Sequence, residues 1–230
     1  MDVVEVFKSI EGEGKRAGVP CVFVRFAGCN LRCSYCDTTY AQKQSDAQLK
    51  GVSPDTVLNL INKESAGCKY VTLTGGEPLL QQFEEMKELL IILAKAGYEV
   101  NIETNGSIDV IPYIQALTDE KYDLDEKVFF TVDRKCNSSG EYFKMYLPQY
   151  SMLRPCDVIK FVVGDFTDLN DASVFLQTYK PRAQVFISTV FGQITPADVI
   201  ERMKLLPTMR NVRFQLQMHK FIWDPDKRGV

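Results

Sequence analysis

Segments typical of β-strands alternate with segments typical of α-helices along the 230 residues of the chain. Residues 21–26 and 158–163 are rich in β-branched and aromatic side chains, whereas residues 80–93 carry apolar side chains at helical spacing. Such alternation is typical of parallel βαβ units wound with one hand. It predicts an α/β fold, a partial (abridged) β/α barrel of about six parallel strands, since a complete barrel usually has about 250 residues.

Cap and turn residues set the expected boundaries. Ser53 and Pro54 are a typical N-cap and first helical residue, and Gly97 is a typical helix end. We expect helices at 54–64, 80–93, 110–117, 142–150, 169–179 and 196–206. We expect strands at 21–26, 70–73, 98–102, 128–132, 158–163, 185–190 and 212–216. No Gly/Ser linker or internal repeat divides the chain, so we expect a single domain over residues 1–230.

The overall composition excludes several classes of protein. Hydrophobic residues make up 45% and charged residues 25%, which excludes disorder and collagen-like repeats. The net charge of −3 argues against a nucleic-acid partner, which needs clustered positive charge. No apolar run approaches the ~20 residues of a membrane span, and residues 1–5 do not resemble the start of a signal peptide. We therefore expect a cytoplasmic protein with no membrane partner.

The cysteines point to a metal centre. There are seven, and an odd number argues against a disulfide framework. Three of them, Cys29, Cys33 and Cys36, fall within eight positions and could hold zinc or an iron–sulfur cluster. Structural zinc needs four ligands, but the only histidine is His219, so zinc would have to recruit an isolated cysteine such as Cys68, Cys136 or Cys156. Three unrelated buried thiols are the remaining alternative.

Three cysteine ligands on a [4Fe–4S] cluster leave one iron open for chemistry. The spacing Cys29-x-x-x-Cys33-x-x-Cys36, with Tyr35 before the third cysteine, resembles that of the radical S-adenosylmethionine (radical SAM) enzymes. The turn 74–78, Thr-Gly-Gly-Glu-Pro, strengthens the resemblance, because that family holds the methionyl amino group of S-adenosylmethionine with a similar turn. The resemblance implies that the reduced cluster cleaves S-adenosylmethionine to a 5′-deoxyadenosyl radical, which abstracts a hydrogen atom.

Further segments narrow the resemblance. The motif Ile10-Glu11-Gly12, Arg25 in the first expected strand, and the tail segments 215–220 and 224–230 are similar to those of the 7-carboxy-7-deazaguanine synthases of queuosine biosynthesis. The resemblance implies a carbon–nitrogen lyase that converts a small pterin, 6-carboxy-5,6,7,8-tetrahydropterin, to 7-carboxy-7-deazaguanine with loss of ammonia. It places the substrate at Ile10, Glu11, Gly12, Arg25 and Thr74. An arginine suits a carboxylate and a carboxylate suits a pterin N–H edge, although Arg25 could instead form a surface salt bridge.

The resemblance also implies cofactor contacts. It assigns Mg²⁺ to Thr38, which could equally be an ordinary turn residue. It assigns S-adenosylmethionine to Tyr35, Cys36, Asp37, Gly76, Glu77, Asp133, Arg134, Lys135, Ser188, Thr189, Val190 and Phe191. Glu103 is a candidate catalytic base or substrate contact, because it ends a strand on the same rim. His219 is a candidate for either a structural or a catalytic role.

Two other functions compete with the synthase. A glycyl-radical-enzyme activase has the same cysteine spacing but acts on a protein, and a non-catalytic Fe–S or zinc module would use the cysteines alone. Neither needs Glu11 and Arg25 to face a pterin. The synthase resemblance further implies a homodimer, with a flavodoxin or ferredoxin as the expected electron donor.

Overall fold

One eight-stranded sheet forms the centre of the molecule. The computed structural model describes residues 1–119, 124, 126–225 and 227–230. The strands follow one another in sequence order across the sheet. They are β1 (Val3–Ile10), β2 (Pro20–Phe26), β3 (Tyr70–Gly75), β4 (Glu99–Thr104), β5 (Val128–Asp133), β6 (Val158–Val163), β7 (Gln184–Thr189) and β8 (Arg213–Phe214). All neighbours from β2 to β8 run parallel, as expected for a partial β/α barrel.

Strand β1 is the main departure from the expected fold. It runs antiparallel to β2, with Phe7 opposite Phe23 and their rings stacked 5.2 Å apart. Most of its side chains are only half-buried, so the segment lacks the continuous apolar run by which the inner strands were predicted. This strand brings the Ile10-Glu11-Gly12 motif to the barrel.

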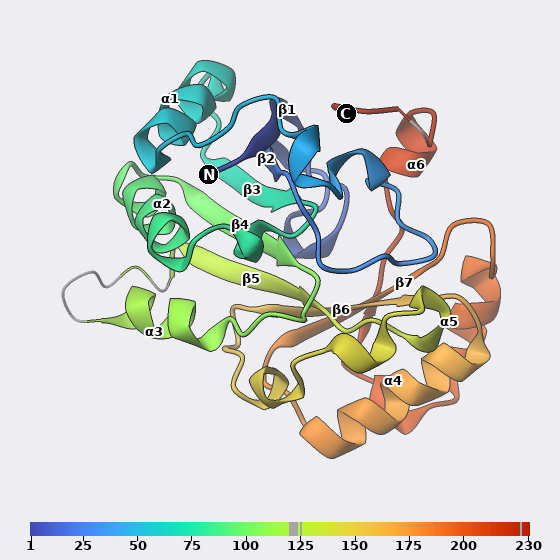
Figure 1. Cartoon of the computed structure of the whole chain (residues 1–230). Coiled ribbons are helices and arrows are strands. Elements are labelled where there is room, and N and C mark those ends of the chain that lie inside the picture. The colour runs from blue at the N-terminus through green and yellow to red at the C-terminus, as the bar shows by residue number, and fades with distance from the viewer. Residues whose placement is uncertain (120–123, 125, 226) are drawn as a thin grey trace.

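Six α-helices among the described residues accompany the sheet. They are α1 (Pro54–Ser65), α2 (Phe83–Lys95), α3 (Ile111–Thr118), α4 (Phe166–Tyr179), α5 (Pro196–Lys204) and α6 (His219–Ile222). Helices α1 to α5 lie along the outer side of the curved sheet, and the short α6 lies near β1 (Figure 1). Ser53 caps α1 as expected, because its side chain accepts a hydrogen bond from the Thr56 amide at 3.2 Å.

Two predicted elements were wrong in detail. Residues 142–150 do not form an α-helix but two 3₁₀ turns, Tyr142–Lys144 and Leu147–Ser151. Pro148 explains this, because a proline disfavours the helical conformation of the preceding residue and lacks an N–H. Strand β8 is also shorter than the expected 212–216, since only two residues pair with β7.

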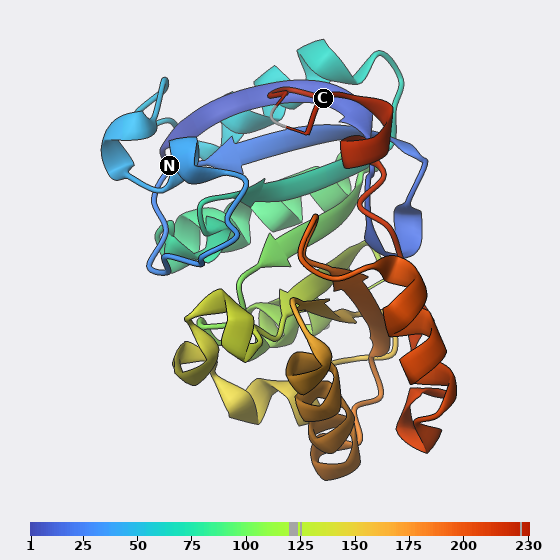
Figure 2. The ribbon, with the colours of Figure 1, turned by 90° about the vertical axis from the view of Figure 1, so that its right-hand side faces the viewer.

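The core fills the space between the sheet and the helices. Leu89, Leu90 and Leu93 of α2 are fully buried, and each such side chain contributes about 1.5–3 kcal/mol by leaving water. Figure 2 shows the curved sheet from the side, with the last residues of the chain crossing near the β1 and β2 end. Within the described ranges, no helix has both the length and the apolar character needed to cross a membrane.

Candidate active site

A cavity of about 490 Å³ lies where the parallel strands end. It is large enough for drug-sized ligands. It brings together seventeen of the residues predicted from the sequence: Ile10, Glu11, Gly12, Arg25, Cys29, Cys33, Tyr35, Cys36, Asp37, Thr38, Thr74, Gly76, Glu103, Asp133, Lys135, Val190 and Phe191. Four others, Glu77, Arg134, Ser188 and Thr189, do not line it. Residues up to 181 positions apart in sequence thus meet in one space, as the barrel architecture predicts.

The cysteine loop follows β2 and is held by backbone hydrogen bonds. Cys29 N donates to Gln42 O at 3.0 Å, and Ser34 N donates to Ser139 O at 3.0 Å. All three cysteines of the loop are free thiols. Burial raises the pKa of Cys33 to about 11, so this thiol must release a proton when a metal binds.

The donor set fits an iron–sulfur cluster. In the part of the chain that the structure describes, no three His, Cys, Asp or Glu side chains are arranged around a single metal ion. Ligands of a four-iron cluster are more widely spaced than those of one ion, because each binds a different iron. Three thiols on one loop, all facing one cavity, match that requirement.

The Gly75–Gly76 turn fixes the cysteine loop. Gly76 N donates to Phe26 O at 2.9 Å, and Glu77 N donates to Gly28 O at 2.7 Å. A Cβ on Gly76 would lie 2.1 Å from Gly28 O, which is far inside van der Waals contact. Gly75 has φ +135, which side-chain-bearing residues rarely adopt. The glycines are therefore needed for the close approach of two backbone segments.

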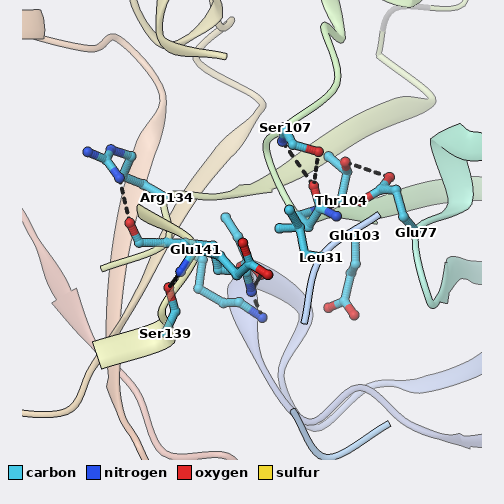
Figure 3. A network of polar contacts seen from close by, with 12 residues as sticks. Leu31, Glu77, Glu103, Thr104, Ser107, Arg134, Ser139 and Glu141 are labelled. Atoms are coloured by element: carbon cyan, nitrogen blue, oxygen red, sulfur yellow. Dashed lines mark hydrogen bonds and ion pairs between the residues drawn. The ribbon is translucent and has the colours of Figure 1, made fainter. Parts of the chain in front are cut away.

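Glu77 is fully buried and accepts three hydrogen bonds. They come from Leu79 N at 3.0 Å, Thr104 Oγ1 at 2.8 Å and Asn105 N at 2.6 Å. Figure 3 shows its side chain directed at Thr104, while Glu103 points away from both. Burial raises the pKa of Glu77 to about 7, despite these donors. Its carboxylate thus ties the turn after β3 to the end of β4.

Two further carboxyl groups face the cavity. Glu103, on β4, accepts a hydrogen bond from Thr74 Oγ1 at 3.2 Å, and Glu11 accepts one from Thr72 Oγ1 at 2.5 Å. Burial raises the pKa of Glu103. Burial and the charge of Glu103 raise the pKa of Glu11 to about 8. Carboxyl groups whose pKa values burial raises are suited to proton transfer and to binding polar ligands.

A buried charge network crosses the floor of the cavity. Lys160 Nζ, from β6, lies 3.3 Å from Glu13 Oε2, and Lys135 Nζ lies 2.5 Å from Asp133 Oδ2. Although burial raises the pKa of Asp133, Lys135 and Lys160 together hold it below its usual value. Sequence reasoning missed Glu13 and Lys160. The sequence does contain one indication of this network, because Lys160 is a single lysine inside the otherwise apolar strand 158–163.

The comparisons with known proteins identify the family. A family model described as Radical SAM superfamily matches residues 23–129. A 7-carboxy-7-deazaguanine synthase from Clostridium acetobutylicum is 39% identical over 231 residues, covering 99% of this chain and 98% of that protein. The chain belongs to the 7-carboxy-7-deazaguanine synthase family. A second synthase, from Methanospirillum hungatei, is 40% identical and covers 98% of this chain and 86% of that protein.

Solved structures agree at the level of the fold. The crystal structure of QueE from Escherichia coli aligns with a TM-score of 0.69 at 23% identity, covering 95% of this chain and 94% of that one. As a radical SAM enzyme of the 7-carboxy-7-deazaguanine synthase family, the chain uses a [4Fe–4S] cluster and S-adenosylmethionine. The three free thiols of the cysteine loop line the cavity beside the strand ends.

Arg25 and Thr38, which the synthase resemblance assigns to substrate and Mg²⁺, both line the cavity. Arg25 Nε forms an ion pair with Glu5 Oε1 at 2.7 Å, and the guanidinium lies near the ring of Tyr40. The alternative salt bridge is therefore present, yet the side chain still faces the cavity. Thr38 Oγ1 donates to Asp37 Oδ1 at 3.0 Å.

The tail that resembles the synthases closes one side of the cavity. Met218 N donates to Gly12 O at 3.1 Å, and a Cβ on Gly12 would lie 2.7 Å from His219 Nδ1. His219 thus packs on the Ile10-Glu11-Gly12 motif and also lines the cavity. Arg228 lies over the ring of Tyr40 at 4.1 Å. Asp226, part of the same tail motif, lies outside the described residues.

Four predicted cofactor contacts do not line the cavity and are buried: Glu77, Arg134, Ser188 and Thr189. The guanidinium of Arg134 lies 4.2 Å from the centroid of the Tyr142 ring. Ser188 and Thr189 are buried in β7, immediately before the wall residues Val190 and Phe191. Their side chains therefore support the wall of the site in this structure.

Proposed function

We propose that this chain converts 6-carboxy-5,6,7,8-tetrahydropterin to 7-carboxy-7-deazaguanine with release of ammonia. The supporting observation is that the cysteine loop shares one cavity with Glu11, Arg25 and Glu103. The reaction balances, because the product differs from the substrate only by the ammonia released. A chain that only stored a cluster would have no use for carboxyl groups and an arginine around the same space.

The cysteine loop and the strand ends hold the cofactors. Cys29, Cys33 and Cys36 would hold the cluster, and Gly76 and Asp133 line the same cavity, where S-adenosylmethionine would bind. When bound, the cluster and S-adenosylmethionine would supply the radical chemistry for abstracting a hydrogen atom from the substrate. The Gly75–Gly76 turn keeps the loop in place by its hydrogen bonds to Phe26 and Gly28.

The opposite wall binds the pterin. Arg25 pairs with the substrate carboxylate in place of Glu5, because the guanidinium that now binds one Glu5 oxygen can bind another carboxylate through the same N–H groups. Glu11 accepts from the N–H edge of the pterin ring. Glu103 transfers protons to and from the nitrogen that leaves, because burial raises the pKa of its carboxyl group and makes it a better proton acceptor.

The remaining assignments are part of the same proposal. Mg²⁺ binds at Thr38, where one hydroxyl, substrate oxygens and water suit a cation that keeps most of its hydration. The active form is a homodimer in which each chain acts as one domain, and a flavodoxin or ferredoxin supplies the electron. The protein works in the cytoplasm, since a reducing compartment suits seven free thiols.

Anaerobic turnover tests the proposal. The reconstituted protein is mixed with the tetrahydropterin, S-adenosylmethionine, Mg²⁺ and a reductant, and the product is followed by mass and ultraviolet absorbance. We expect 7-carboxy-7-deazaguanine to accumulate over many turnovers. A protein that only modifies an added glycyl-radical enzyme would be an activase, and a colourless zinc protein inert to S-adenosylmethionine would be a non-catalytic module.

A further inference from the structure

Two buried polar side chains, Arg16 and Thr72, form a hydrogen-bonded series that ends on Glu11. Arg16 Nη2 is 2.9 Å from Thr72 Oγ1, and Thr72 Oγ1 is 2.5 Å from Glu11 Oε2. Thr72 is fully buried in the middle of β3 and does not line the cavity. None of the sequence motifs includes Arg16 or Thr72.

The donor and acceptor capacity of each group fixes the direction of these hydrogen bonds. A guanidinium can only donate, so Thr72 Oγ1 must accept from Arg16. The Cys21 thiol also donates to Thr72 Oγ1, at 3.3 Å. The single hydroxyl proton of Thr72 is then left to donate to Glu11 Oε2. Oε2 must therefore accept, and Oε1 is the oxygen of Glu11 that remains for a ligand in the cavity.

Arg16 and Glu11, at the two ends of this hydrogen-bonded series, are each held by further contacts. Arg16 donates to Glu99 O at 2.8 Å and to Val71 O at 3.0 Å. Its guanidinium also lies 5.3 Å from the Tyr70 ring centroid and 5.1 Å from that of Phe129. At the other end, the backbone of Glu11 is fixed because its N–H donates to Val19 O at 2.8 Å and its carbonyl accepts from Gly18 N at 2.7 Å.

We propose that Thr72, anchored by Arg16, is a positioning residue that turns Glu11 Oε1 toward the substrate and stabilises the ionised carboxylate. The inference rests on the proposed function, in which Glu11 accepts from the pterin N–H edge. Thr72 acts through Glu11 and touches neither substrate nor cofactor.

The charges around Glu11 explain why its ionised carboxylate needs the Thr72 hydroxyl. Burial, Glu103 on β4 and Glu13 all raise the pKa of Glu11, whereas the Thr72 hydroxyl and Arg16 lower it. The Cys21 thiol on β2 is neutral at physiological pH, because burial raises its pKa to about 12. Without the Thr72 hydroxyl, the carboxyl of Glu11 would keep its proton to higher pH, and only the longer contact from Arg16 Nη2 to Oε2, at 3.6 Å, would hold its orientation.

The variant Thr72→Val tests this, because it removes the hydroxyl and keeps the side-chain shape. We expect the KM for the pterin to rise about tenfold, the effect of losing a hydrogen bond to a charged group, while kcat at saturating substrate changes much less. We also expect the pH midpoint for pterin binding to move upward, since a lost donor disfavours the ionised form. Thr72→Ser, which keeps a hydroxyl, should restore both quantities.

Thr131→Val is the matched control. Thr131 is also a buried strand threonine, but it donates to Asn101 Oδ1 at 2.9 Å and has no link to Glu11. It should lose stability without a change in pterin KM or pH midpoint. If Thr72→Val does not accumulate as folded protein, Thr72→Ala removes the same hydroxyl with a smaller side chain.

The outcomes separate this inference from the proposed function. Normal KM and pH midpoint in a folded, cluster-containing Thr72→Val protein would overturn the positioning role while the synthase activity stood. Equal KM changes in Thr72→Val and Thr131→Val would also overturn it, because they would indicate a general packing effect. A wild-type protein that neither binds nor converts the pterin would instead refute the proposed function.

Discussion

Lys160 Nζ lies 3.5 Å from Asp133 Oδ1, and this ion pair joins β5 to β6 within the cavity. Burial alone would lower the pKa of Lys160, but Asp133, Glu13 and Glu103 hold it well above its usual value. The ammonium is therefore a permanent positive charge among acidic groups that belong to both the cofactor side and the substrate side of the site. This makes Lys160 a central support of the cavity.

The variant Lys160→Met should lose stability and change its pH dependence. Removing one partner of a buried ion pair costs about 3 kcal/mol. The charge of Lys160 also lowers the pKa of Glu103, so its loss should move the turnover midpoint governed by that group to higher pH. Denaturant unfolding of the apoprotein and the pH–rate profile measure the two effects.

Lys204→Met provides the control for this variant. Lys204 pairs with Glu201 at 2.5 Å on the surface, where both side chains are mostly exposed. Such pairs contribute about 0–1 kcal/mol. Similar unfolding curves for the two lysine variants would contradict the role given to Lys160.

Gly76→Ala should prevent cluster assembly. Its Cβ would meet two backbone oxygens, Gly28 O at 2.1 Å and Ala41 O at 2.5 Å, so the cysteine loop must move. The measurement is iron and sulfide per chain after anaerobic reconstitution, which should fall severalfold. Gly97→Ala has open space around its Cβ and should keep its iron, despite some backbone strain. Full iron loading of Gly76→Ala would show that the close approach is dispensable.

Cys33→Ala should lose the cluster and keep the fold. The side chain is a proposed metal ligand, and the substitution removes one half-buried thiol from a loop outside the sheet. Iron content and visible absorbance should drop to background while the far-ultraviolet circular dichroism stays that of the wild type. Cys68→Ala, whose thiol donates to Pro20 O at 3.0 Å, should retain full iron. Unchanged iron in Cys33→Ala would remove this residue from the ligand set.

The stability of the apoprotein should fall as pH rises from about 5 to 8. Glu77 has a pKa of about 7 and Glu11 of about 8 in the folded chain, both raised chiefly by burial, against 4.5 for an ordinary glutamate. Between these limits the folded state holds protons that the unfolded chain has released, so unfolding becomes easier with pH. Glu77→Gln should flatten this decline by up to about 3 kcal/mol.

Unfolding free energies at pH 5, 6, 7 and 8 provide the comparison. Glu88→Gln, on the exposed side of α2, should follow the wild-type curve. Parallel curves for the wild type and Glu77→Gln would mean that Glu77 is ionised throughout the range. That result would mean that the three hydrogen-bond donors outweigh burial in setting the pKa of Glu77.

Much of the inner sheet and of the cofactor loop was predictable from sequence. Strand 158–163 was predicted with its observed ends, because five β-branched or aromatic residues surround Lys160 and the segment is bounded by Asp157 and Gly164. The cysteine loop and the Gly75–Gly76 turn follow β2 and β3, where the barrel places chemistry. The spacing of the cysteines and the order of the strands along the sequence are enough to predict the position of this loop and this turn.

Features that depend on side-chain direction were not predictable. The sequence suggested that Glu77 would pair with a ligand ammonium, but its carboxylate is occupied by three protein donors. Nor does any local pattern link Arg16 to Thr72, which lie 56 positions apart and meet only in the folded barrel. Strand β1 escaped prediction because its partly polar side chains resemble a loop motif as much as an edge strand.

The most direct test of the whole account is the stoichiometry of anaerobic turnover. Ammonia, 7-carboxy-7-deazaguanine and 5′-deoxyadenosine are measured together in reactions with the tetrahydropterin. We predict equal amounts of ammonia and deazapurine, formed only when the cluster, S-adenosylmethionine and reductant are all present. Slow formation of 5′-deoxyadenosine alone, with the pterin unchanged, would contradict the assignment of this cavity to deazaguanine synthesis.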